Sequence, residues 1–171
     1  MKIHFGGLNL FNHILKARFL SRPNCFLVLC KWNSQTIFAF LPNPGRLQGL
    51  LIPGSSIYLI REKSSPNRKT HYTAVAVVRD GYPIMLDAHR TNEVAQYLLQ
   101  KGKVPGLEEA EVVKREVRIG RNRFDFLLRK GNEDILLEVK CCTLVGERVA
   151  MFPDAVTERG TQHLRELVKF S

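Results

Sequence analysis

Two acidic residues and a lysine in the C-terminal half of the chain have the types and the spacing to bind a divalent metal ion. The run 123–140 contains two apolar stretches on either side of Gly131-Asn132, a pair that favours a two-residue β-hairpin turn. With the turn there, Asp125 lies opposite Glu138, because paired residue numbers in a hairpin keep a constant sum. Lys140 lies two residues beyond Glu138 and therefore on the same face of its strand.

This acidic face has an electrostatic conflict that a metal ion would relieve. Two carboxylates directly opposite one another on neighbouring strands have Cβ atoms about 5 Å apart and repel. Mg²⁺ or Mn²⁺ held by Asp125 and Glu138, with the carbonyl of Val139 as a third ligand, could polarise a phosphoryl oxygen. Lys140 would then orient the attacking water, and the chemistry would be phosphodiester hydrolysis. The alternative is a solvated surface hairpin in which Lys140 merely neutralises the two acids.

The elements that must position this hairpin follow from the C-terminal half. We expect a helix over 91–102 started by Thr91 or Asn92, a strand over 111–119, a short strand over 149–152 and a helix over 157–170. In the strand 111–119, one face should carry Val113, Val117 and Ile119. Glu116 lies on the other face, as an extra acid or as a surface partner of Arg118 or Lys114. In the last helix, Leu164, Leu167 and Val168 should form the buried stripe.

The N-terminal half has the texture of a small β-barrel. Strand-like segments follow one another without a long helix between them, at 25–31, 35–41, 55–61, 69–79 and 82–87. Five short strands of this kind predict an OB-fold-like barrel. The strand texture stops near residue 87, so we expect an OB-fold-like nucleic-acid-binding domain over 1–87 and a second domain over 88–171. The overall class is α+β.

The charge distribution predicts a polyanionic partner. The net charge is +10, and residues 1–88 carry 11 Lys and Arg against 3 Asp and Glu, a net charge of +8. Basic residues interleaved with aromatic ones suit phosphate contacts and base stacking. The candidates in this half are Arg18, Arg22, Lys31, Trp32, Arg46, Arg68, Lys69 and Tyr72. The prolines and the glycine of 41–47 should present Asn43 and Arg46 rigidly, either to a phosphate or as a plain connection. Arg123 and Arg159 are further candidates.

Several classes of protein are disfavoured. No run of apolar residues is long enough to span a membrane, and the N-terminus lacks the pattern of a signal peptide. We therefore expect a cytoplasmic protein with no membrane partner. The four cysteines, Cys25, Cys30, Cys141 and Cys142, lack the spacing of a metal site and are expected to be reduced thiols.

The order of elements around Asp125, Glu138 and Lys140 matches the core of restriction-endonuclease-like (PD-(D/E)XK) nucleases. Over nearly its full length the chain also resembles the sugar fermentation stimulation protein (SfsA) family. The motifs are Arg22-Pro23-Asn24, the run 42–47, Arg68-Lys69-Thr70, Arg123-Phe124-Asp125, Glu138-Val139-Lys140 and, most specifically, the run 152–160 followed by His163-Leu164. The sequence differs from the family pattern in having Asn122 and Cys141 where small residues are usual; neither removes a candidate ligand.

The resemblance implies an N-terminal OB-fold, a nuclease-like C-terminal domain and DNA binding with little sequence preference. It places Asp125, Glu138 and Lys140 at the positions of the nuclease motif. It also implies a further apolar strand after the last helix, so that this chain is C-terminally incomplete. We expect either a monomer of low stability or a homodimer that covers the open sheet edge. Three functions stay open: a Mg²⁺-dependent endonuclease, a non-catalytic DNA-binding regulatory factor linked to sugar metabolism, and an RNA-directed binder.

Overall fold

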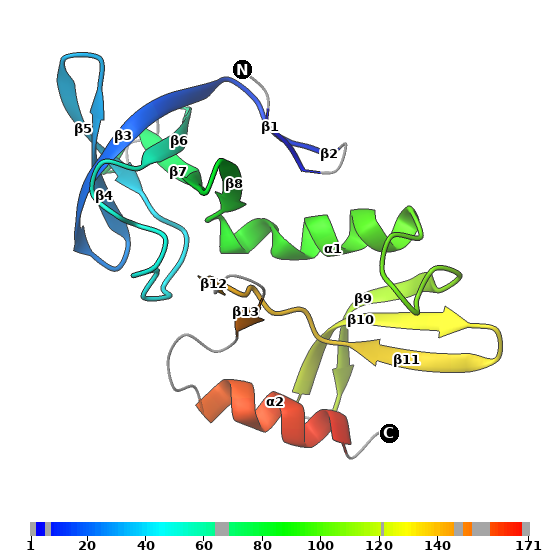
Figure 1. The fold of residues 1–171 in the computed structure, drawn as a ribbon. Coiled ribbons are helices and arrows are strands. Elements are labelled where there is room, and N and C mark those ends of the chain that lie inside the picture. The colour runs from blue at the N-terminus through cyan, green and yellow to red at the C-terminus, as the bar shows by residue number, and fades with distance from the viewer. Residues whose placement is uncertain are drawn as a thin grey trace. The chain divides into compact units, whose positions relative to one another are not determined.

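The computed structural model describes residues 3–5, 8–63, 69–120, 122–145, 149–151 and 158–168 (Figure 1). The chain divides into two compact units. The first consists of Met1–Arg90 with Cys142–Ala155, and the second of Thr91–Cys141 with Val156–Ser171.

The first unit contains a closed five-stranded β-barrel, formed by β3 (Ile14–Asn24), β4 (Leu27–Trp32), β5 (Gln35–Phe40), β6 (Ser56–Arg61) and β7 (Tyr72–Arg79). The strands lie in the order β5-β4-β3-β6-β7, and every neighbour in that series is antiparallel. The barrel closes where β5 and β7 pair in parallel, Ala39 beside Tyr72 and Phe40 beside Thr73. This strand order with a parallel closure is the topology of an OB-fold, so the predicted fold is confirmed.

The membership of the barrel differs from the sequence prediction. The prediction omitted β3 and counted the segment 82–87 instead. That segment forms β8 (Tyr82–Met85), a sixth strand that pairs only with β7 and lies outside the closure. Pro23 of β3 lacks an N–H group and cannot donate to a ladder. The ladder between β3 and β4 tolerates it because the register shifts on both sides of Ser21.

The barrel interior is filled by residues that alternate along the strands. Val28 and Cys30 of β4, Ala39 of β5 and Ile57 and Leu59 of β6 are fully buried. Each burial of an aliphatic side chain of this size contributes roughly 1.5–3 kcal/mol. Burial also raises the pKa of the Cys30 thiol from 9.0 to about 12, because the thiolate would lose its hydration.

Short elements complete the first unit. β1 (Ile3–Phe5) pairs with β2 (Leu8–Phe11), and β12 (Leu144–Val145) pairs with β13 (Ala150–Met151). The 3₁₀-helix η1 (Ala88–Arg90) follows the barrel, and Asp87 Oδ1 caps it by accepting from the His89 N–H at 3.1 Å. The predicted strand 149–152 corresponds to β13, while Phe152 lies outside the described residues.

The second unit contains a three-stranded antiparallel sheet with the order β11-β10-β9, formed by β9 (Glu111–Ile119), β10 (Asn122–Lys130) and β11 (Glu133–Leu137). The register predicted for the hairpin is confirmed from Lys130–Glu133 at the turn to Phe126–Leu137. Gly131 adopts a φ of 60°, a conformation that glycine takes without the steric cost of a Cβ.

A hydrophobic core lies on one face of this sheet. Phe126 and Leu128 of β10 are fully buried and belong to a cluster with Leu99 of the helix α1 (Thr91–Gln100). Ile135, Leu137 and Val139 pack against the same cluster, as the alternation along the hairpin predicts. The core therefore fixes which side of the hairpin is left for polar residues such as Asp125.

Val113 of β9 does not share a face with Val117 and Ile119, so this part of the predicted alternation was wrong. Leu127 lies opposite Lys114, but the next residue, Leu128, lies opposite Val112, so one extra residue is inserted in β9. This bulge turns Val112 toward the core and leaves Val113 48% exposed. A bulge reverses the alternation of side chains beyond it, and a strict period of two does not predict one.

The final helix, α2 (Glu158–Val168), begins and ends close to its predicted limits. Its predicted buried stripe was wrong in part, since Leu164 is 59% exposed and Val168 is 73% exposed. Coverage of the stripe or of the sheet edge by a second copy stays a prediction. Within the described residues, no helix combines the length and the apolar character needed to cross a membrane.

Candidate functional site

Asp125 is held by two hydrogen bonds at the end of the hairpin ladder. It lies on β10 between the buried Phe124 and Phe126, and its side chain takes the opposite, polar face. Its Oδ1 accepts from Asn92 Nδ2 at 2.8 Å, and its Oδ2 accepts from the Val139 backbone N–H at 2.8 Å. Each carboxylate oxygen can accept more than one bond, so both remain able to bind a cation.

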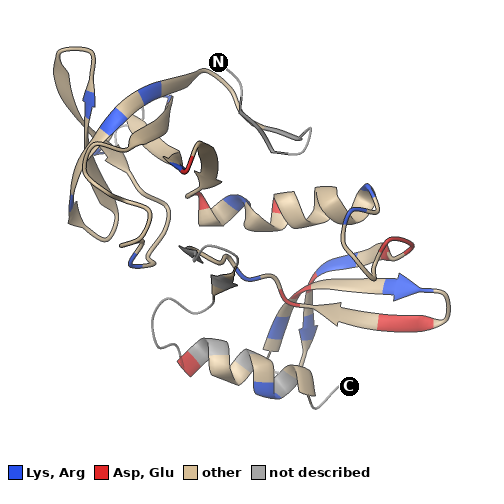
Figure 2. Ribbon diagram, in the orientation of Figure 1, with Lys and Arg blue, Asp and Glu red and all other residues tan. Residues whose placement is uncertain are grey.

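Glu138 and Lys140 form an ion pair immediately after β11, where acidic and basic residues follow one another along the chain (Figure 2). The Glu138 side chain is only 8% exposed, whereas that of Lys140 is 29% exposed. A carboxylate this deeply buried needs a cationic or hydrogen-bonding partner to offset its lost hydration, and Lys140 supplies one. The two side chains lie on the same side of the chain, as their spacing predicts.

These contacts link the three predicted residues into one cluster. The recorded ladder ends at Phe126–Leu137, one pair before Asp125 and Glu138. The chain then departs from the ladder, and the N–H of Val139 bonds to the side chain of Asp125 instead of to a backbone carbonyl. Asp125 is thereby fixed against the residue between Glu138 and Lys140.

The donor set suits a hard divalent cation. Two carboxylates are the usual protein contribution to a Mg²⁺ site, because water and substrate phosphate supply the remaining oxygens. In the part of the chain that the structure describes, no three or more His, Cys, Asp or Glu residues are grouped to hold a metal ion by themselves. The cluster itself offers two carboxylates, Asp125 and Glu138, as oxygen donors.

Asn92 is a site residue that the sequence analysis treated only as a helix cap. It lies in the first turn of α1, and its side-chain amide donates to Asp125 across 33 residues of sequence. Since an amide group cannot lose its hydrogen-bonding capacity with pH, it orients the carboxylate over a wide pH range. No spacing rule within the hairpin points to this contact.

Glu116 has a different partner from the predicted ones. Its Oε2 lies 3.6 Å from Arg123 Nη1, so it pairs with Arg123 rather than with Arg118 or Lys114. Both side chains are more than half exposed. An exposed pair of this kind contributes little stability, so Arg123 can exchange Glu116 for a phosphate group at small cost.

Two predicted nucleic-acid contacts in the first unit make hydrogen bonds within the fold. The guanidinium of Arg22 donates to the carbonyls of Gly45 and Arg46 at 2.7 Å each, of Cys25 at 2.7 Å and of Asn43 at 3.1 Å. The side chain of Asn43 is turned inward: it is 4% exposed, donates to the Leu86 carbonyl and accepts from the Gly45 N–H. Arg22 and Asn43 therefore support the loop 41–47, and their contact with nucleic acid stays a prediction.

Two further basic residues that are predicted to contact nucleic acid lie on the surface of the first unit. Arg46 and Lys69 are exposed on the first unit. Arg68 lies outside the described residues, and of Arg159 only its place in α2 is described. The predicted stacking residues Trp32 and Tyr72 are partly buried against the barrel core, with ring centroids 6.2 Å apart, and base stacking on them stays a prediction.

Comparison with protein families gives two matches, which follow one another along the chain. Residues 20–86 match the family model described as the SfsA N-terminal OB domain. Residues 89–171 match the model described as the sugar fermentation stimulation protein RE domain.

Individual relatives give the same result. The chain is 41% identical over 162 residues to a sugar fermentation stimulation protein homolog of Clostridium botulinum, covering 94% of this chain and 70% of that protein. It is 40% identical over 153 residues to a homolog from Methanothermobacter thermautotrophicus, covering 90% of this chain and 63% of that protein. Among solved structures, Pyrococcus furiosus SfsA in complex with Ca²⁺ matches 99% of this chain and 68% of its own, with a TM-score of 0.78 and 28% identity.

Proposed function

Because the chain belongs to the sugar fermentation stimulation protein (SfsA) family, we propose that it binds DNA without sequence preference and hydrolyses phosphodiester bonds with a divalent metal. The observation that carries this proposal is the cluster of Asp125, Glu138 and Lys140. One carboxylate is held by two hydrogen bonds, another is buried against a lysine, and both follow from a single hairpin.

Asp125 and Glu138 would hold the ion, which we propose to be Mg²⁺ or Mn²⁺. When bound, such an ion neutralises the two carboxylates, polarises a phosphoryl oxygen and lowers the pKa of a bound water. The chain's own residues contribute orientation. Asn92 and the Val139 N–H keep Asp125 in one rotamer, which limits the entropy lost when the site assembles.

Lys140 has two tasks in this proposal. In the structure it pairs with Glu138 and offsets part of the hydration that this buried carboxylate loses. With an ion held by Asp125 and Glu138, the ammonium group of Lys140 would be able to donate a hydrogen bond to water or to a phosphate oxygen. Arg123, whose partner Glu116 is exposed, would contribute a further phosphate contact from the neighbouring part of the sheet.

The choice of a hard cation is supported from outside the chain. The related Pyrococcus furiosus structure is described as a complex with Ca²⁺, which indicates divalent metal binding in the family. Ca²⁺, Mg²⁺ and Mn²⁺ all prefer oxygen ligands, although their coordination numbers and geometries differ.

The four cysteines are free thiols in the structure, which supports the proposed cytoplasmic location.

The ion pair between Lys140 and Glu138 also favours a second candidate function. A lysine that already neutralises the buried acid leaves the cluster stable without a metal ion. The protein would then be a non-catalytic DNA-binding factor, linked by its family to sugar metabolism. The acids would stabilise the fold in this case and would perform no chemistry.

Plasmid nicking separates the two candidates. The purified protein is incubated with supercoiled plasmid in Mg²⁺, in Mn²⁺ and in EDTA, and the Asp125→Asn and Glu138→Gln variants are tested beside it. We expect metal-dependent nicking that both variants abolish, while salt-sensitive DNA binding is retained. Glu116→Gln is the matched control, because it removes an exposed acid of the same sheet and should nick normally. Nicking that survives in both site variants would refute the catalytic proposal.

A further inference from the structure

The solvent-facing side of strands β4 and β5 carries apolar residues where an ordinary barrel strand carries polar ones. The inward residues Val28, Cys30 and Ala39 are buried, so the alternating residues on these strands face outward. In the pairing of β4 with β5, Leu27 lies opposite Phe40 and Leu29 lies opposite Phe38. Both faces of this pair are therefore apolar.

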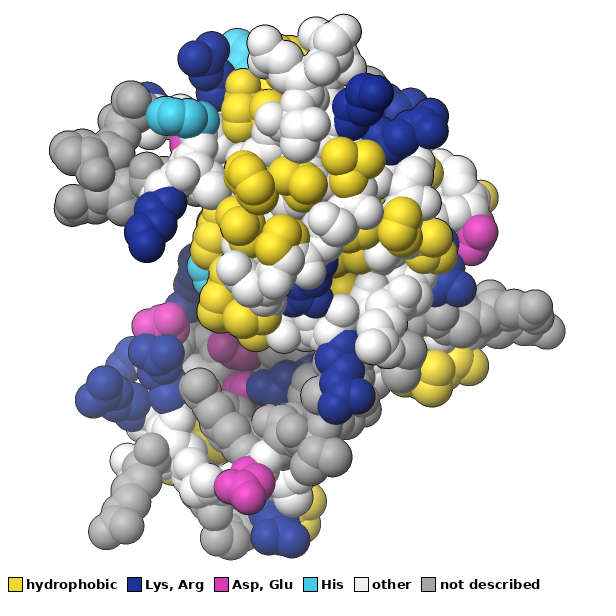
Figure 3. All heavy atoms as spheres, turned by 90° about the vertical axis from the view of Figure 1, so that its left-hand side faces the viewer, with side chains coloured by type: hydrophobic (Ala, Val, Ile, Leu, Met, Phe, Trp, Pro, Cys, Tyr) yellow, Lys and Arg dark blue, Asp and Glu magenta, His cyan; other side chains and the backbone are white. Residues whose placement is uncertain are grey.

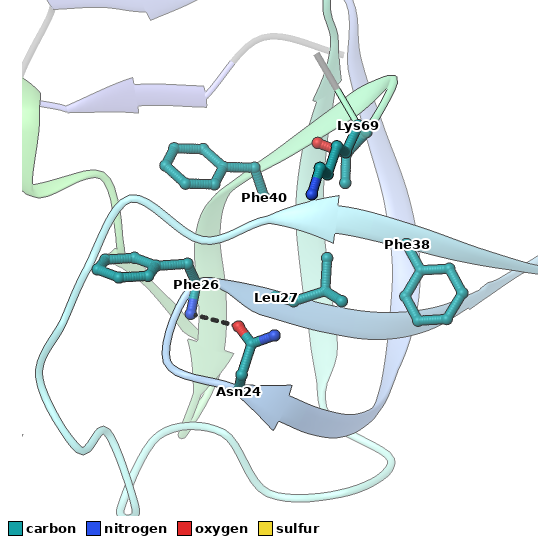
Figure 4. Close-up of a pocket in the computed structure, with 7 residues that line it drawn as sticks. Asn24, Phe26, Leu27, Phe38, Phe40 and Lys69 are labelled. Carbon is teal, nitrogen blue, oxygen red and sulfur yellow. Dashed lines mark hydrogen bonds between the residues drawn. The ribbon is translucent and has the colours of Figure 1, made fainter. Parts of the chain in front are cut away.

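These residues form a hollow that is open to solvent. It has a volume of about 530 Å³ and is lined by Asn24, Phe26, Leu27, Phe38, Phe40, Lys69 and Thr70. Phe26 is 49% exposed and Phe38 is 50% exposed. Figure 4 shows the rings of Phe26 and Phe40 on one side of Leu27 and the ring of Phe38 on the other.

The aromatic rings are held in place by local structure. Phe26 follows a turn in which its N–H donates to Asn24 Oδ1 at 2.9 Å, and its ring is stacked with that of Phe40, with centroids 6.4 Å apart and planes 23° apart. Phe38 lies within a barrel strand. Exposed apolar area is unfavourable in water, so a patch of this kind marks an interaction surface.

The elements that line the hollow are those that OB-folds use for their ligands. β4 and β5 are the second and third strands of the barrel, Phe26 lies in the connection between its first two strands, and Lys69 and Thr70 lie between its fourth and fifth. OB-folds bind oligonucleotides or oligosaccharides on the face of strands two and three and on these two connections.

Charge decides between those two ligands. On the outward face, Lys31 continues the row of Leu27 and Leu29, and Arg18 lies beside it on β3. Figure 3, which views the side on which β4 and β5 lie, shows hydrophobic side chains with Lys and Arg at the margins of the patch.

Among the described residues that line this hollow, none is acidic. The three acids of residues 1–88 are engaged elsewhere, Glu62 with Thr73, Asp80 with Arg79 and Asp87 with Arg90. A patch bordered by cations and free of lining acids favours a polyanion over a neutral sugar.

We propose that this face binds single-stranded nucleic acid, with unpaired bases stacked on Phe26 and Phe38 and a phosphate held by Lys69. This inference rests on the proposed nucleic-acid function and adds the form of the substrate. The bases of a duplex are already stacked on one another and paired, so their flat faces cannot reach an aromatic side chain. A single strand exposes those faces together with its phosphates.

Binding of a short, fluorescein-labelled oligothymidine to the full chain in EDTA, followed by fluorescence anisotropy, tests the inference. The same measurement is made with a duplex of the same length and with an uncharged glucose oligomer as competitor. We expect single-strand binding to be tighter than duplex binding. Phe26→Ala and Phe38→Ala should each weaken single-strand binding by about 5- to 150-fold, the loss of one stacked base, and change duplex binding less than twofold.

Two further variants show whether stacking is responsible. Tyr82→Ala removes an aromatic side chain that is 72% exposed and does not line the hollow, so single-strand affinity should not change. Phe38→Trp retains an aromatic plane. It should preserve the affinity, and its additional indole fluorescence should be quenched when oligothymidine binds.

The outcomes separate this inference from the proposed function. Unchanged single-strand affinity in both alanine variants, or displacement of oligothymidine by the glucose oligomer, overturns the inference. If the protein nicks or binds duplex DNA while the phenylalanine variants behave as wild type, only the inference fails. If the protein binds neither single strand nor duplex, the inference and the nucleic-acid function fail together.

Discussion

Replacing Arg22 tests whether this residue organises a loop or contacts a phosphate. Its guanidinium donates four hydrogen bonds to backbone carbonyls, three of them in the loop 41–47. In Arg22→Ala these four carbonyl oxygens lose a charged hydrogen-bond donor. Exposed carbonyls can bond to water in its place, whereas carbonyls shielded from water are left without a donor. The loop also contains Asn43 and leads to Leu47 and Leu50, which are buried in the barrel core. Loss of the clamp should therefore loosen one end of the barrel.

The magnitude follows from the number and the exposure of the bonds. A net contribution of about 0.5–1.5 kcal/mol per bond gives roughly 2–6 kcal/mol for the set. Because two of the bonds are exposed and their acceptors can be rehydrated, we expect the lower part, about 2–4 kcal/mol. For a chain of this length that corresponds to a fall in Tm of roughly 4–16 °C.

The assay compares urea denaturation with the salt dependence of DNA binding in the same variants. Arg22→Ala should lower the urea concentration at the unfolding midpoint. In buffer without urea, where the variant is folded, the logarithm of its DNA-binding constant should fall with the logarithm of the salt concentration at the wild-type slope. Lys69→Ala is the control: it should leave stability unchanged and reduce the slope by about one. Arg22→Ala that is as stable as wild type, with a slope reduced by about one, would refute the structural role and restore the phosphate contact.

Three further predictions address the site, the barrel core and the sheet. Asn92→Ala should weaken Mn²⁺ binding by up to about 10- to 100-fold, the effect expected for a group that orients a ligand, because Asp125 loses its amide donor; titration calorimetry measures this, and an unchanged affinity would argue against orientation. Since burial raises the pKa of Cys30 to about 12, the folded state retains a proton that the unfolded state releases above pH 9.0. The contribution of Cys30 to the free energy of unfolding is thus complete below pH 9. It falls with rising pH by about 1.4 kcal/mol per pH unit, and the free energy of unfolding of Cys30→Ala, measured by urea denaturation, should not show this decline. Val112→Asp should prevent folding of the sheet while Val113→Asp is tolerated, because the β9 bulge turns only the former inward; circular dichroism would contradict the bulge if both variants behaved alike.

Much of the hairpin could be predicted because it depends on local rules. A glycine-containing turn and strict alternation are properties of neighbouring residues, so the register from Lys130–Glu133 to Phe126–Leu137 follows without tertiary information. The helix α1 and the strand β9 were predicted for the same reason, with their ends within a few residues.

Long-range packing decided the remainder. The amide of Asn92 reaches Asp125 and the guanidinium of Arg22 reaches the loop 41–47 only after distant segments have packed together. The exposed Phe38 and the partly exposed Phe40 could have been noticed in the sequence. In the run Ile37-Phe38-Ala39-Phe40, the residues that point to either face of the strand are all apolar. Such a run is typical of a strand buried on both faces. Only the closed barrel shows that one of those faces is open to solvent.

The amino-acid sequence by itself determined the family, the α+β class and the three residues of the acidic cluster, since each depends on residue types at fixed short spacings. The tertiary structure alone decided which strands close the barrel, which basic residues support the backbone, and which carboxylate is buried. The physical reason is that burial and hydrogen-bond partners depend on contacts between segments 20 or more residues apart, for which no local periodicity exists.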